Sequence, residues 1–374
     1  MASVYLGRTT KNGAEELVAL KVIKEELLED ANFSDMFLDE AKILSRLSHE
    51  HVIRTLEYGV SGRRHFIAME LLLGRTLADV WDPLAKDGKR LPLNLAAWIC
   101  ARVAEGLHSA HELADENGTP LLVVHRDVNP TNIFLTYDGR VKLIDFGLAK
   151  ARKRASKKSL AGVVKGKIPY LAPEQTHMKP IDRRVDIFSL GTTLWEVGTG
   201  RRLFKRDTDF ATLQAVREGN IPDPRTFHPD FPEALFRITS KALQYDPKDR
   251  YQTADAMRRD LDAYLAGAAP NDMSTELART LNDLFPGELE RQHTWLNQAA
   301  SRDRQPPAKT MRPPVPVPAN ADDDPNDDTN TLSSLLPGAA KRASLPPSPP
   351  RYRWAVIAAT VLVVALLFLL LSKR

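Results

Sequence analysis

The stretch "HRDVNPTNIFL" at residues 125–135 is followed by the strand-like run "GRVKLI" and then by "DFG" at 145–147. This order predicts a catalytic loop, a hairpin and a metal-binding turn. Phosphoryl transfer needs a carboxylate that orients the attacking hydroxyl and accepts its proton. It also needs an amide and a second carboxylate that hold magnesium ions. The three side chains of these types at this spacing are Asp127, Asn132 and Asp145.

Residues on both sides of this stretch fit the same chemistry. Lys21 in "VALK" can neutralise the α- and β-phosphates of a nucleotide, and Glu40 in the helical run "FSDMFLDEAKILSRL" can clamp that lysine. Downstream, Asp186 in "DIFSLG" is suited to hold the backbone of the catalytic loop. Glu174 in "APE" can pair with Arg250 in "DPKDRY".

Residues 1–265 therefore resemble a protein kinase of the eukaryotic-like, Hanks-type group, in its bacterial serine/threonine branch. A lone "DFG" or "VALK" is a weak signal, but five motifs in the correct order and spacing are specific. The resemblance implies an α+β bilobal protein kinase fold, with a small β-rich N-lobe at 1–72 and a larger α-helical C-lobe at 73–265. Early β-branched runs and later helical periodicity agree with that order.

The resemblance also implies a reaction, in which the γ-phosphate of ATP moves with Mg²⁺ to serine or threonine hydroxyls of proteins. Asp127 is then the base or orienting group, and Lys21 and Glu40 form the phosphate anchor. Asn132 and Asp145 are the metal ligands. His125 and Phe146 become internal packing residues, and Met69 the gatekeeper. The residues that it places around ATP are Ala2, Val4, Ala19, Lys21, Met69, Glu70 and Leu72.

The N-terminus departs from the family pattern. The glycine-rich loop of the family reads GxGxxGxV, and "MASVY" matches only its second half, with Ala2 at the third glycine position and Val4 at the valine. We expect that the true reading frame starts upstream and that Met1 is an internal methionine of the loop. The alternative is a genuine truncation, which leaves the phosphates uncovered and one sheet edge unpaired. The DNA upstream of the start distinguishes the two.

Two further departures bear on activity. Most serine/threonine kinases carry a lysine two residues after the catalytic aspartate, where this chain has Asn129. Most also carry a threonine where "GKIPYLAPE" has Lys167. Our hypothesis is that the Lys167 ammonium replaces the missing lysine near the γ-phosphate, because an ammonium acts as a movable point charge. The alternative is drift in a weak or inactive enzyme.

The activation segment "GLAKARKRASKKSLAGVVKGK" is unusually basic. Phosphates on Ser156 or Ser159 would find Arg126 and neighbouring cations, so self-phosphorylation within a transient homodimer is a plausible switch. A solvated loop without regulatory function is the alternative. Tyrosine specificity is disfavoured, because the catalytic loop lacks the "AAR"-like pattern of tyrosine kinases.

The C-terminal third divides by composition. Residues 266–304 can form one or two short amphipathic helices, interrupted at Pro286 and Gly287, as an appendage to the kinase domain. Residues 305–350 hold 12 of the 26 prolines and an acidic cluster, which predicts a disordered linker. Residues 354–371 carry no charge over 18 positions, which is long enough for a transmembrane helix. A buried core helix is the alternative for that run.

Basic residues set the expected orientation and compartment. Four precede the apolar run and two follow it, so we expect a single-pass protein of the inner (cytoplasmic) membrane with its kinase domain in the cytoplasm. A net charge of +4 is too mild for a general nucleic-acid surface, and the single cysteine, Cys100, excludes an internal disulfide framework. The rival hypotheses are a pseudokinase scaffold with weak or no catalysis and, less favoured, a small-molecule phosphotransferase.

Overall fold

The computed structural model describes one compact part of the chain. The chain divides into two compact units, residues 1–308 and 309–374, and everything described lies in the first. The described ranges are 2–11, 14–23, 37–38, 41–62, 64–146, 167–177, 180–268 and 272–302.

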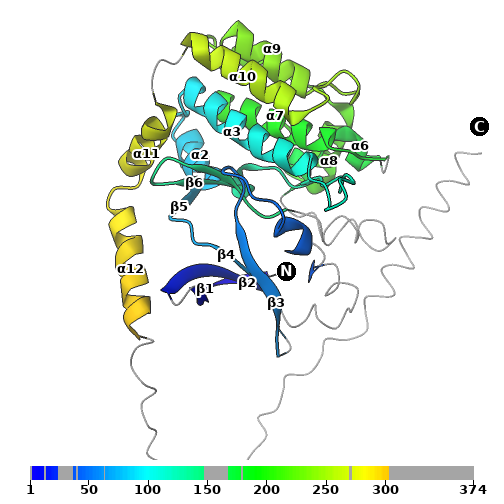
Figure 1. The fold of residues 1–374 in the computed structure, drawn as a ribbon. Coiled ribbons are helices and arrows are strands. Elements are labelled where there is room, and N and C mark those ends of the chain that lie inside the picture. The colour runs from blue at the N-terminus through cyan, green and yellow to red at the C-terminus, as the bar shows by residue number, and fades with distance from the viewer. Residues whose placement is uncertain are drawn as a thin grey trace, which may run out of the picture. The chain divides into compact units, whose positions relative to one another are not determined.

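An antiparallel sheet of four strands, in the order β1-β2-β4-β3, forms the first lobe (Figure 1). Directly opposed residues of antiparallel strands share a face of the sheet. Val4 and Ile67 both lie opposite Lys21, so these three side chains share one face. Ile67 and Met69 on that face are buried in a small cluster with Phe37. The strands are β1 (Ala2–Lys11), β2 (Ala14–Ile23), β3 (Thr55–Ser61) and β4 (Arg64–Glu70).

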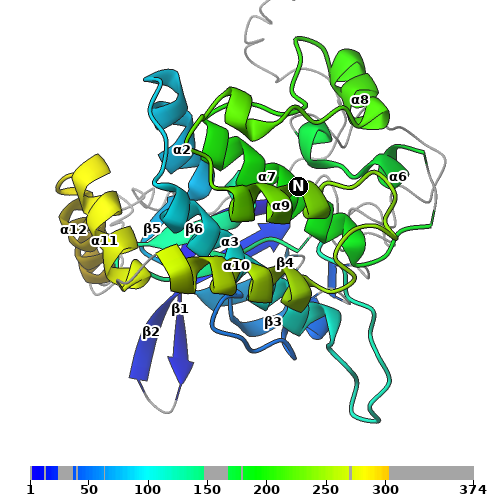
Figure 2. The ribbon, with the colours of Figure 1, turned by 90° about the horizontal axis from the view of Figure 1, so that it is seen from above.

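Helices form the second lobe, which confirms the predicted order of a β-rich lobe followed by a helical one. At its centre is α7, in which every residue from Val185 to Thr199 is buried. A helix that is buried all round lies in a core. α3 packs against both α7 and α10 (Figure 2). The helices of this lobe are α2 (Leu77–Lys86), α3 (Leu93–His111), α6 (Pro173–Thr176), α7 (Arg184–Thr199), α8 (Asp209–Glu218), α9 (Glu233–Ala242) and α10 (Ala254–Ala268).

A small sheet lies where the two lobes meet. Its order is β5-β6-β7, from β5 (Gly74–Thr76), β6 (Ile133–Thr136) and β7 (Val141–Leu143). The Leu143 amide donates to the His51 carbonyl at 2.8 Å, and the Ile53 amide donates to the Leu143 carbonyl at 3.0 Å. These bonds fix the segment that precedes β3 to the strand that leads into "DFG".

After α10 come two further helices, α11 (Met273–Leu284) and α12 (Glu288–Arg302). The helical path is interrupted between them, where Gly287 has a φ of 70°. In α11, Leu277 and Leu281 are buried in the main core of the helical lobe. At the break, the Arg75 guanidinium lies 5.2 Å from the Phe285 ring centre, and its Nη2 lies 2.7 Å from Glu288 Oε1. The α11–α12 junction therefore packs against β5.

The turn between β6 and β7 holds α11 in place. The Ser274 hydroxyl donates to the Gly139 carbonyl at 3.0 Å, and a Cβ on Gly139 would lie 2.2 Å from the Ser274 carbonyl oxygen. Gly139 also has a φ of 83°, which disfavours any residue with a Cβ. The chain offers a matched control in Gly118, which has a φ of 79° but no atom within 4 Å of the point that a Cβ would occupy.

We expect Gly139→Ala to lower the free energy of unfolding by about 3 kcal/mol, because it adds backbone strain to a clash with the α11 backbone. Gly118→Ala should cost only the strain, about 1 kcal/mol. Urea denaturation of both variants measures the difference. Equal losses would mean that α11 does not depend on contact with this turn.

Of the described residues, none belongs to a helix with both the length and the apolar character needed to span a bilayer. The predicted linker at 305–350 and the predicted span at 354–371 lie outside the described residues, so both stay predictions.

Candidate active site

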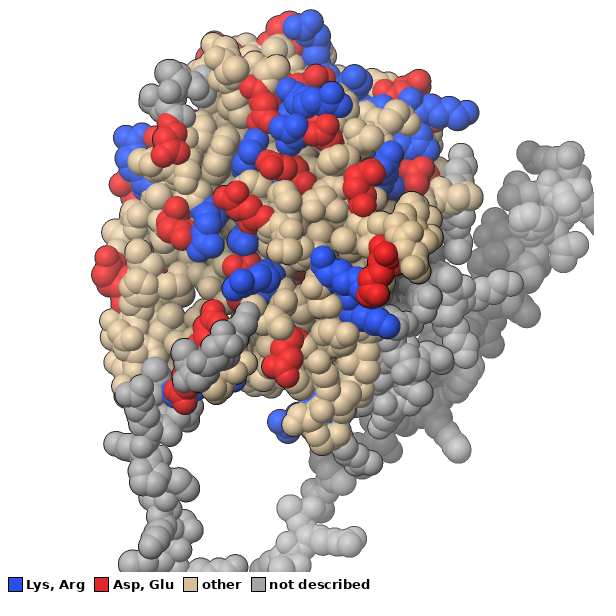
Figure 3. All heavy atoms as spheres, in the orientation of Figure 1, with Lys and Arg blue, Asp and Glu red and all other residues tan. Residues whose placement is uncertain are grey.

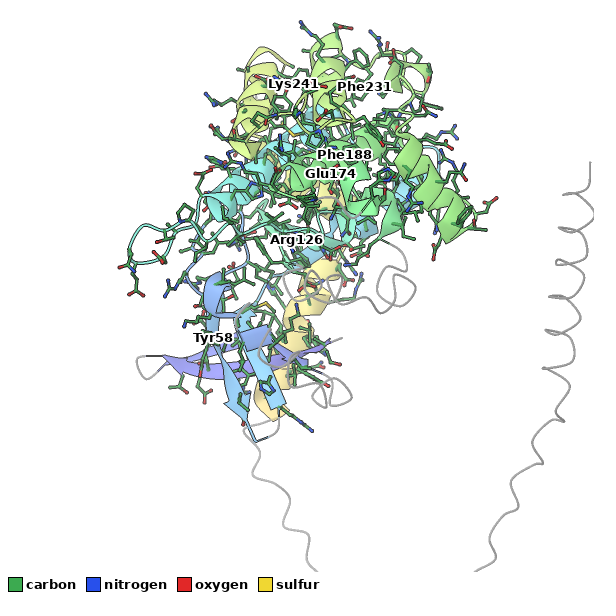
Figure 4. All side chains as sticks on the ribbon, turned by 90° about the vertical axis from the view of Figure 1, so that its right-hand side faces the viewer. Tyr58, Arg126, Glu174, Phe188, Phe231 and Lys241 are labelled. Atoms are coloured by element: carbon green, nitrogen blue, oxygen red, sulfur yellow. The ribbon has the colours of Figure 1, made fainter. Side chains whose placement is uncertain are left out.

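The backbone of the catalytic loop is held by one buried carboxylate. Asp186, from the first turn of α7, accepts the amide of His125 at 2.8 Å and the amide of Arg126 at 2.7 Å. Arg126 has a φ of 63°, which is rare for a residue with a Cβ, so these bonds stabilise a strained conformation. His111 Nε2 lies 2.8 Å from the same carboxylate. Figure 4 shows Arg126 between the sheet lobe and the helical lobe.

The buried carboxylate of Asp127 has contacts on both oxygens. Asn129 Nδ2 donates to the Asp127 carbonyl at 2.8 Å and lies 3.3 Å from Oδ1. The Lys167 ammonium pairs with Oδ2. Asn129 also accepts the Thr131 amide at 2.9 Å, which starts the short helix η2 (Pro130–Asn132). Asn129 and Lys167, the two residues that depart from the family pattern, thus both contact the Asp127 carboxylate.

The second carboxylate lies opposite the predicted phosphate anchor. Lys21 Nζ is 2.5 Å from Asp145 Oδ1. Asp145 itself has a φ of 57°, and its side chain is 46% exposed. A small cavity lies beside it, lined among others by Lys21, Met69 and Phe146. The structure therefore brings two of the predicted site residues, 124 positions apart in the chain, into direct contact.

Asn132 connects the two carboxylate-bearing segments. The Asn132 side-chain amide donates to the backbone carbonyl of Asp127 at 2.8 Å, and the backbone carbonyl of Asn132 accepts the Ile144 amide at 2.9 Å. The side-chain oxygen of Asn132 and the carboxylate of Asp145 are the hard oxygen donors that Mg²⁺ prefers. Among the described residues no group of three His, Cys, Asp or Glu side chains is placed to hold a metal. Two oxygen donors of this kind suit a Mg²⁺ ion whose coordination is completed by water and phosphate.

His125 and Phe146 pack inside the loop, as predicted. Their ring centres are 4.4 Å apart, and both residues are buried. The Asp127 amide donates to His125 Nδ1 at 3.2 Å, so the other ring nitrogen, 3.2 Å from the Ile144 carbonyl, carries the hydrogen. Burial lowers the pKa of the His125 imidazole, which keeps the ring neutral. His125 is therefore a structural residue of the loop.

The residues predicted to surround adenine lie along the sheet face and the segment after β4. Ala19 lies opposite Met69, and Val4 is 64% exposed. Glu70 Oε1 accepts hydrogen bonds from Lys142 Nζ at 2.7 Å and from the Arg54 amide at 2.8 Å, and the Glu70 amide donates to the Arg54 carbonyl at 3.0 Å. Ala2, at the start of β1, and Leu72, two residues after the end of β4, are partly buried. Glu40, Ser156 and Ser159 lie outside the described residues.

Glu174 and Arg250 form the predicted ion pair. Arg250 donates to both carboxylate oxygens, at 2.7 and 2.9 Å, and the guanidinium carbon lies 4.8 Å from the Phe188 ring centre. Figure 4 labels Glu174 and Phe188 next to each other in the helical lobe. A bidentate pair of this kind fixes the end of the activation segment to the loop after α9.

Several residues of the site could not be found from sequence reasoning. His111 at the end of α3 contacts Asp186. Tyr170, in the short helix after Lys167, donates to Glu196 and accepts a hydrogen bond from Arg202. No spacing pattern marks them, because their contacts join elements that are distant in the chain.

Comparison with known proteins gives concordant matches. Residues 1–261 match the family model described as the protein kinase domain. The tyrosine-protein kinase MasK of Myxococcus xanthus is 40% identical over 267 residues, which cover 71% of this chain and 41% of that protein. The serine/threonine-protein kinase PknB of Mycobacterium leprae is 34% identical over 275 residues, which cover 72% of this chain and 42% of that protein. The chain thus spans about two fifths of the length of these relatives.

A solved structure agrees with these matches. The Mycobacterium tuberculosis PknI kinase domain superimposes with a TM-score of 0.53 at 28% sequence identity, and the match covers 72% of this chain and 91% of that one.

Proposed function

This chain belongs to the protein kinase family, and we propose that it transfers the γ-phosphate of ATP to serine or threonine hydroxyls of protein substrates, with Mg²⁺ as cofactor. The observation that carries the proposal is the pairing of two cations with two carboxylates at one site. Lys167 forms an ion pair with Asp127, and Lys21 forms one with Asp145. Asn132 is hydrogen-bonded to the segments that carry the two carboxylates. A scaffold without catalysis has no chemical need for this arrangement.

In the proposed reaction, the substrate hydroxyl oxygen attacks the γ-phosphorus and the bond to the β–γ bridging oxygen breaks. Asp127 orients the hydroxyl and takes its proton, and Asn129 keeps that carboxylate in place. Lys167 supplies positive charge beside the transferred group, and Lys21 moves from Asp145 to the nucleotide phosphates. Asn132 and Asp145 are the residues that would hold Mg²⁺, and the ion would supply positive charge to the phosphate oxygens.

Serine and threonine hydroxyls are the favoured acceptors of the phosphoryl group. The catalytic loop has "HRDVNPTN", without the "AAR"-like pattern of tyrosine kinases, and most of the similar curated relatives are named serine/threonine kinases. Tyrosine is the second candidate, because the 40% identical relative is named a tyrosine-protein kinase. Figure 3 shows acidic and basic side chains interspersed on the face that it draws, which agrees with a protein substrate better than with a nucleic acid.

The test uses three peptides that differ only in carrying serine, threonine or tyrosine, with labelled ATP and Mg²⁺. We expect transfer to serine and threonine, and a loss of about a hundredfold to ten-thousandfold in Asp127→Asn. Asp138→Asn, an aspartate of the β6–β7 turn that pairs with Arg140, is the matched control and should retain activity. Nucleotide binding without transfer to any peptide would instead support the pseudokinase scaffold.

Two finer proposals concern residues outside the described ranges. A helix at 354–371 would anchor the protein in the inner membrane, and loss of membrane sedimentation on deleting 354–374 tests this. Phosphorylation of Ser156 or Ser159 within a transient homodimer would order the activation segment. Mass spectrometry of the protein after incubation with ATP, compared with the double alanine variant, tests the switch.

A further inference from the structure

The helices α11 and α12 form an appendage beyond the residues that match the kinase family model, which end at position 261. The appendage nevertheless belongs to the fold, because Leu277 and Leu281 of α11 are buried in the main core of the helical lobe. Figures 1 and 2 both show α11 and α12 beside β5. Its contacts with this part of the chain indicate a role that the family match does not assign.

Arg75, in the middle of β5, joins that strand to the junction of α11 and α12. The Arg75 Nη2 atom lies 2.7 Å from Glu288 Oε1, and the guanidinium carbon lies 5.2 Å from the Phe285 ring centre. The side chains of the ion pair are only 33% and 18% exposed, so water screens the pair less than it screens a fully exposed one. Glu288 also lies in the first turn of α12, where the helix dipole favours a carboxylate. An ion pair and a ring contact thus fix β5 to the appendage.

A second contact attaches α11 to the other end of the same small sheet. Ser274, near the start of α11, donates its hydroxyl proton to the Gly139 carbonyl at 3.0 Å, in the turn between β6 and β7. Phe285, which contacts Arg75, directly follows the last residue of α11. The two ends of α11 therefore hold the β5-β6-β7 sheet at two separate points.

This sheet carries the residues that would hold Mg²⁺. β6 begins at Ile133, directly after Asn132. β7 ends at Leu143, two residues before Asp145. β5 pairs with β6 along its whole length and also contacts η2, the short helix that contains Asn132. A displacement of β5 would therefore reach Asn132 through paired and contacting backbone.

We propose that Arg75 is a positioning residue of the kinase reaction, through which the α11–α12 appendage holds the Asn132 segment in place. This inference rests on the proposed function. Arg75 acts through β5 and η2 rather than by contact with the reacting groups. Mg²⁺ demands a nearly ideal octahedral arrangement of its oxygen ligands, so a less firmly held Asn132 raises the Mg²⁺ concentration that the reaction needs.

The test compares the Mg²⁺ dependence of peptide phosphorylation in the wild type and in Arg75→Met, which keeps an apolar stem and removes the charge. We expect the Mg²⁺ concentration for half-maximal rate to rise about tenfold, as expected for the loss of one charged hydrogen bond, while kcat at saturating Mg²⁺ stays within about threefold. A variant that is only less stable would lose active protein, and so kcat, without a change in this midpoint. An unchanged midpoint would overturn the proposal.

Hydrogen exchange separates this inference from the proposed function, because it needs no turnover. The backbone amides at the β5–β6 pairing, including that of Tyr137, which donates to the Leu73 carbonyl at 3.1 Å, should exchange about tenfold faster in Arg75→Met. Unchanged exchange in a folded variant would overturn the proposed contact between the appendage and the sheet. If the wild type phosphorylates no peptide, the kinase proposal fails, while the exchange result still decides whether the appendage holds β5.

The appendage offers two matched controls. Arg291 pairs with the same Glu288 at 2.7 Å, and Arg279 pairs with Glu276, but each of these pairs lies within a single helix. Arg291→Met and Arg279→Met should therefore keep the wild-type Mg²⁺ midpoint and the wild-type exchange rates. If Arg75→Met does not fold, Glu288→Gln replaces it in both assays. An equal shift in Arg291→Met would mean that the effect comes from a weaker α12, and it would overturn the role of Arg75.

Discussion

Replacing Lys167 by methionine is expected to lower kcat by about a hundredfold to a thousandfold while leaving the Kd for ATP nearly unchanged. Methionine keeps most of the length of the side chain and removes the charge. The position two residues after Asp127 carries Asn129 instead of a cation, and among the described residues the Lys167 ammonium pairs with this carboxylate. Transition-state charge on the phosphoryl group would then be poorly compensated.

Single-turnover kinetics and nucleotide titration together check this expectation. A kcat of Lys167→Met within about threefold of the wild-type kcat would refute the hypothesis that Lys167 replaces the lysine missing at position 129. A loss of ATP binding as large as the loss of turnover would place Lys167 on the ground-state nucleotide.

An exchange of residues tests the same idea from the other side. In Asn129→Lys/Lys167→Thr the ammonium returns to the catalytic loop, and we expect kcat to recover at least about tenfold over Lys167→Thr alone. Recovery should be incomplete, because Asn129 also accepts the Thr131 amide, and a lysine ammonium has no acceptor. No recovery at all would mean that the two departures are independent drift.

The sequence was most informative where chemistry requires both a residue type and a fixed spacing. Asp127, Asn132 and Asp145 lie on one loop and hairpin, so their spacing alone constrains their geometry. Glu174 with Arg250, and Asp186 with the catalytic loop, were predicted from the motifs in which they occur, and the structure contains both contacts. Such pairs join distant segments, and composition or periodicity would not have found them.

Contacts that are particular to this chain were not predictable. Arg202 lies in "TGRRLF", where nothing in the sequence indicates that its guanidinium will rest on Trp81 and face Glu196. Leu277 and Leu281 of α11 follow the apolar periodicity that any amphipathic helix shows, so the pattern predicted a helix without showing that it completes the main core. Both depend on tertiary packing.

The second large effect is expected at Asp186, where substitution by alanine should lower the free energy of unfolding by about 3–5 kcal/mol. The change leaves two buried backbone amides, those of His125 and Arg126, without their acceptor. It also removes the buried partner of His111. Each orphaned donor costs about 1–3 kcal/mol, and relaxation of the loop offsets part of the sum.

Activity should fall even under conditions in which Asp186→Ala is folded. Arg126 has a positive φ that Asp186 helps to maintain, and Arg126 directly precedes Asp127, so its relaxation would turn the catalytic carboxylate away from Lys167. Asp186→Asn keeps one acceptor oxygen for the two amides, and we expect about half the loss of stability with a smaller loss of kcat.

Urea denaturation and peptide phosphorylation at low temperature measure both effects. The control is Asp182→Ala, just before the same helix, where an exposed aspartate pairs with Arg184 and removal should cost about 1 kcal/mol or less. If Asp186→Ala loses stability but keeps full kcat, the loop conformation does not depend on this carboxylate. The strain at Arg126 would then have to be maintained by the remaining contacts of the loop, chiefly those of Asn129 and Asn132 with the Asp127 carbonyl.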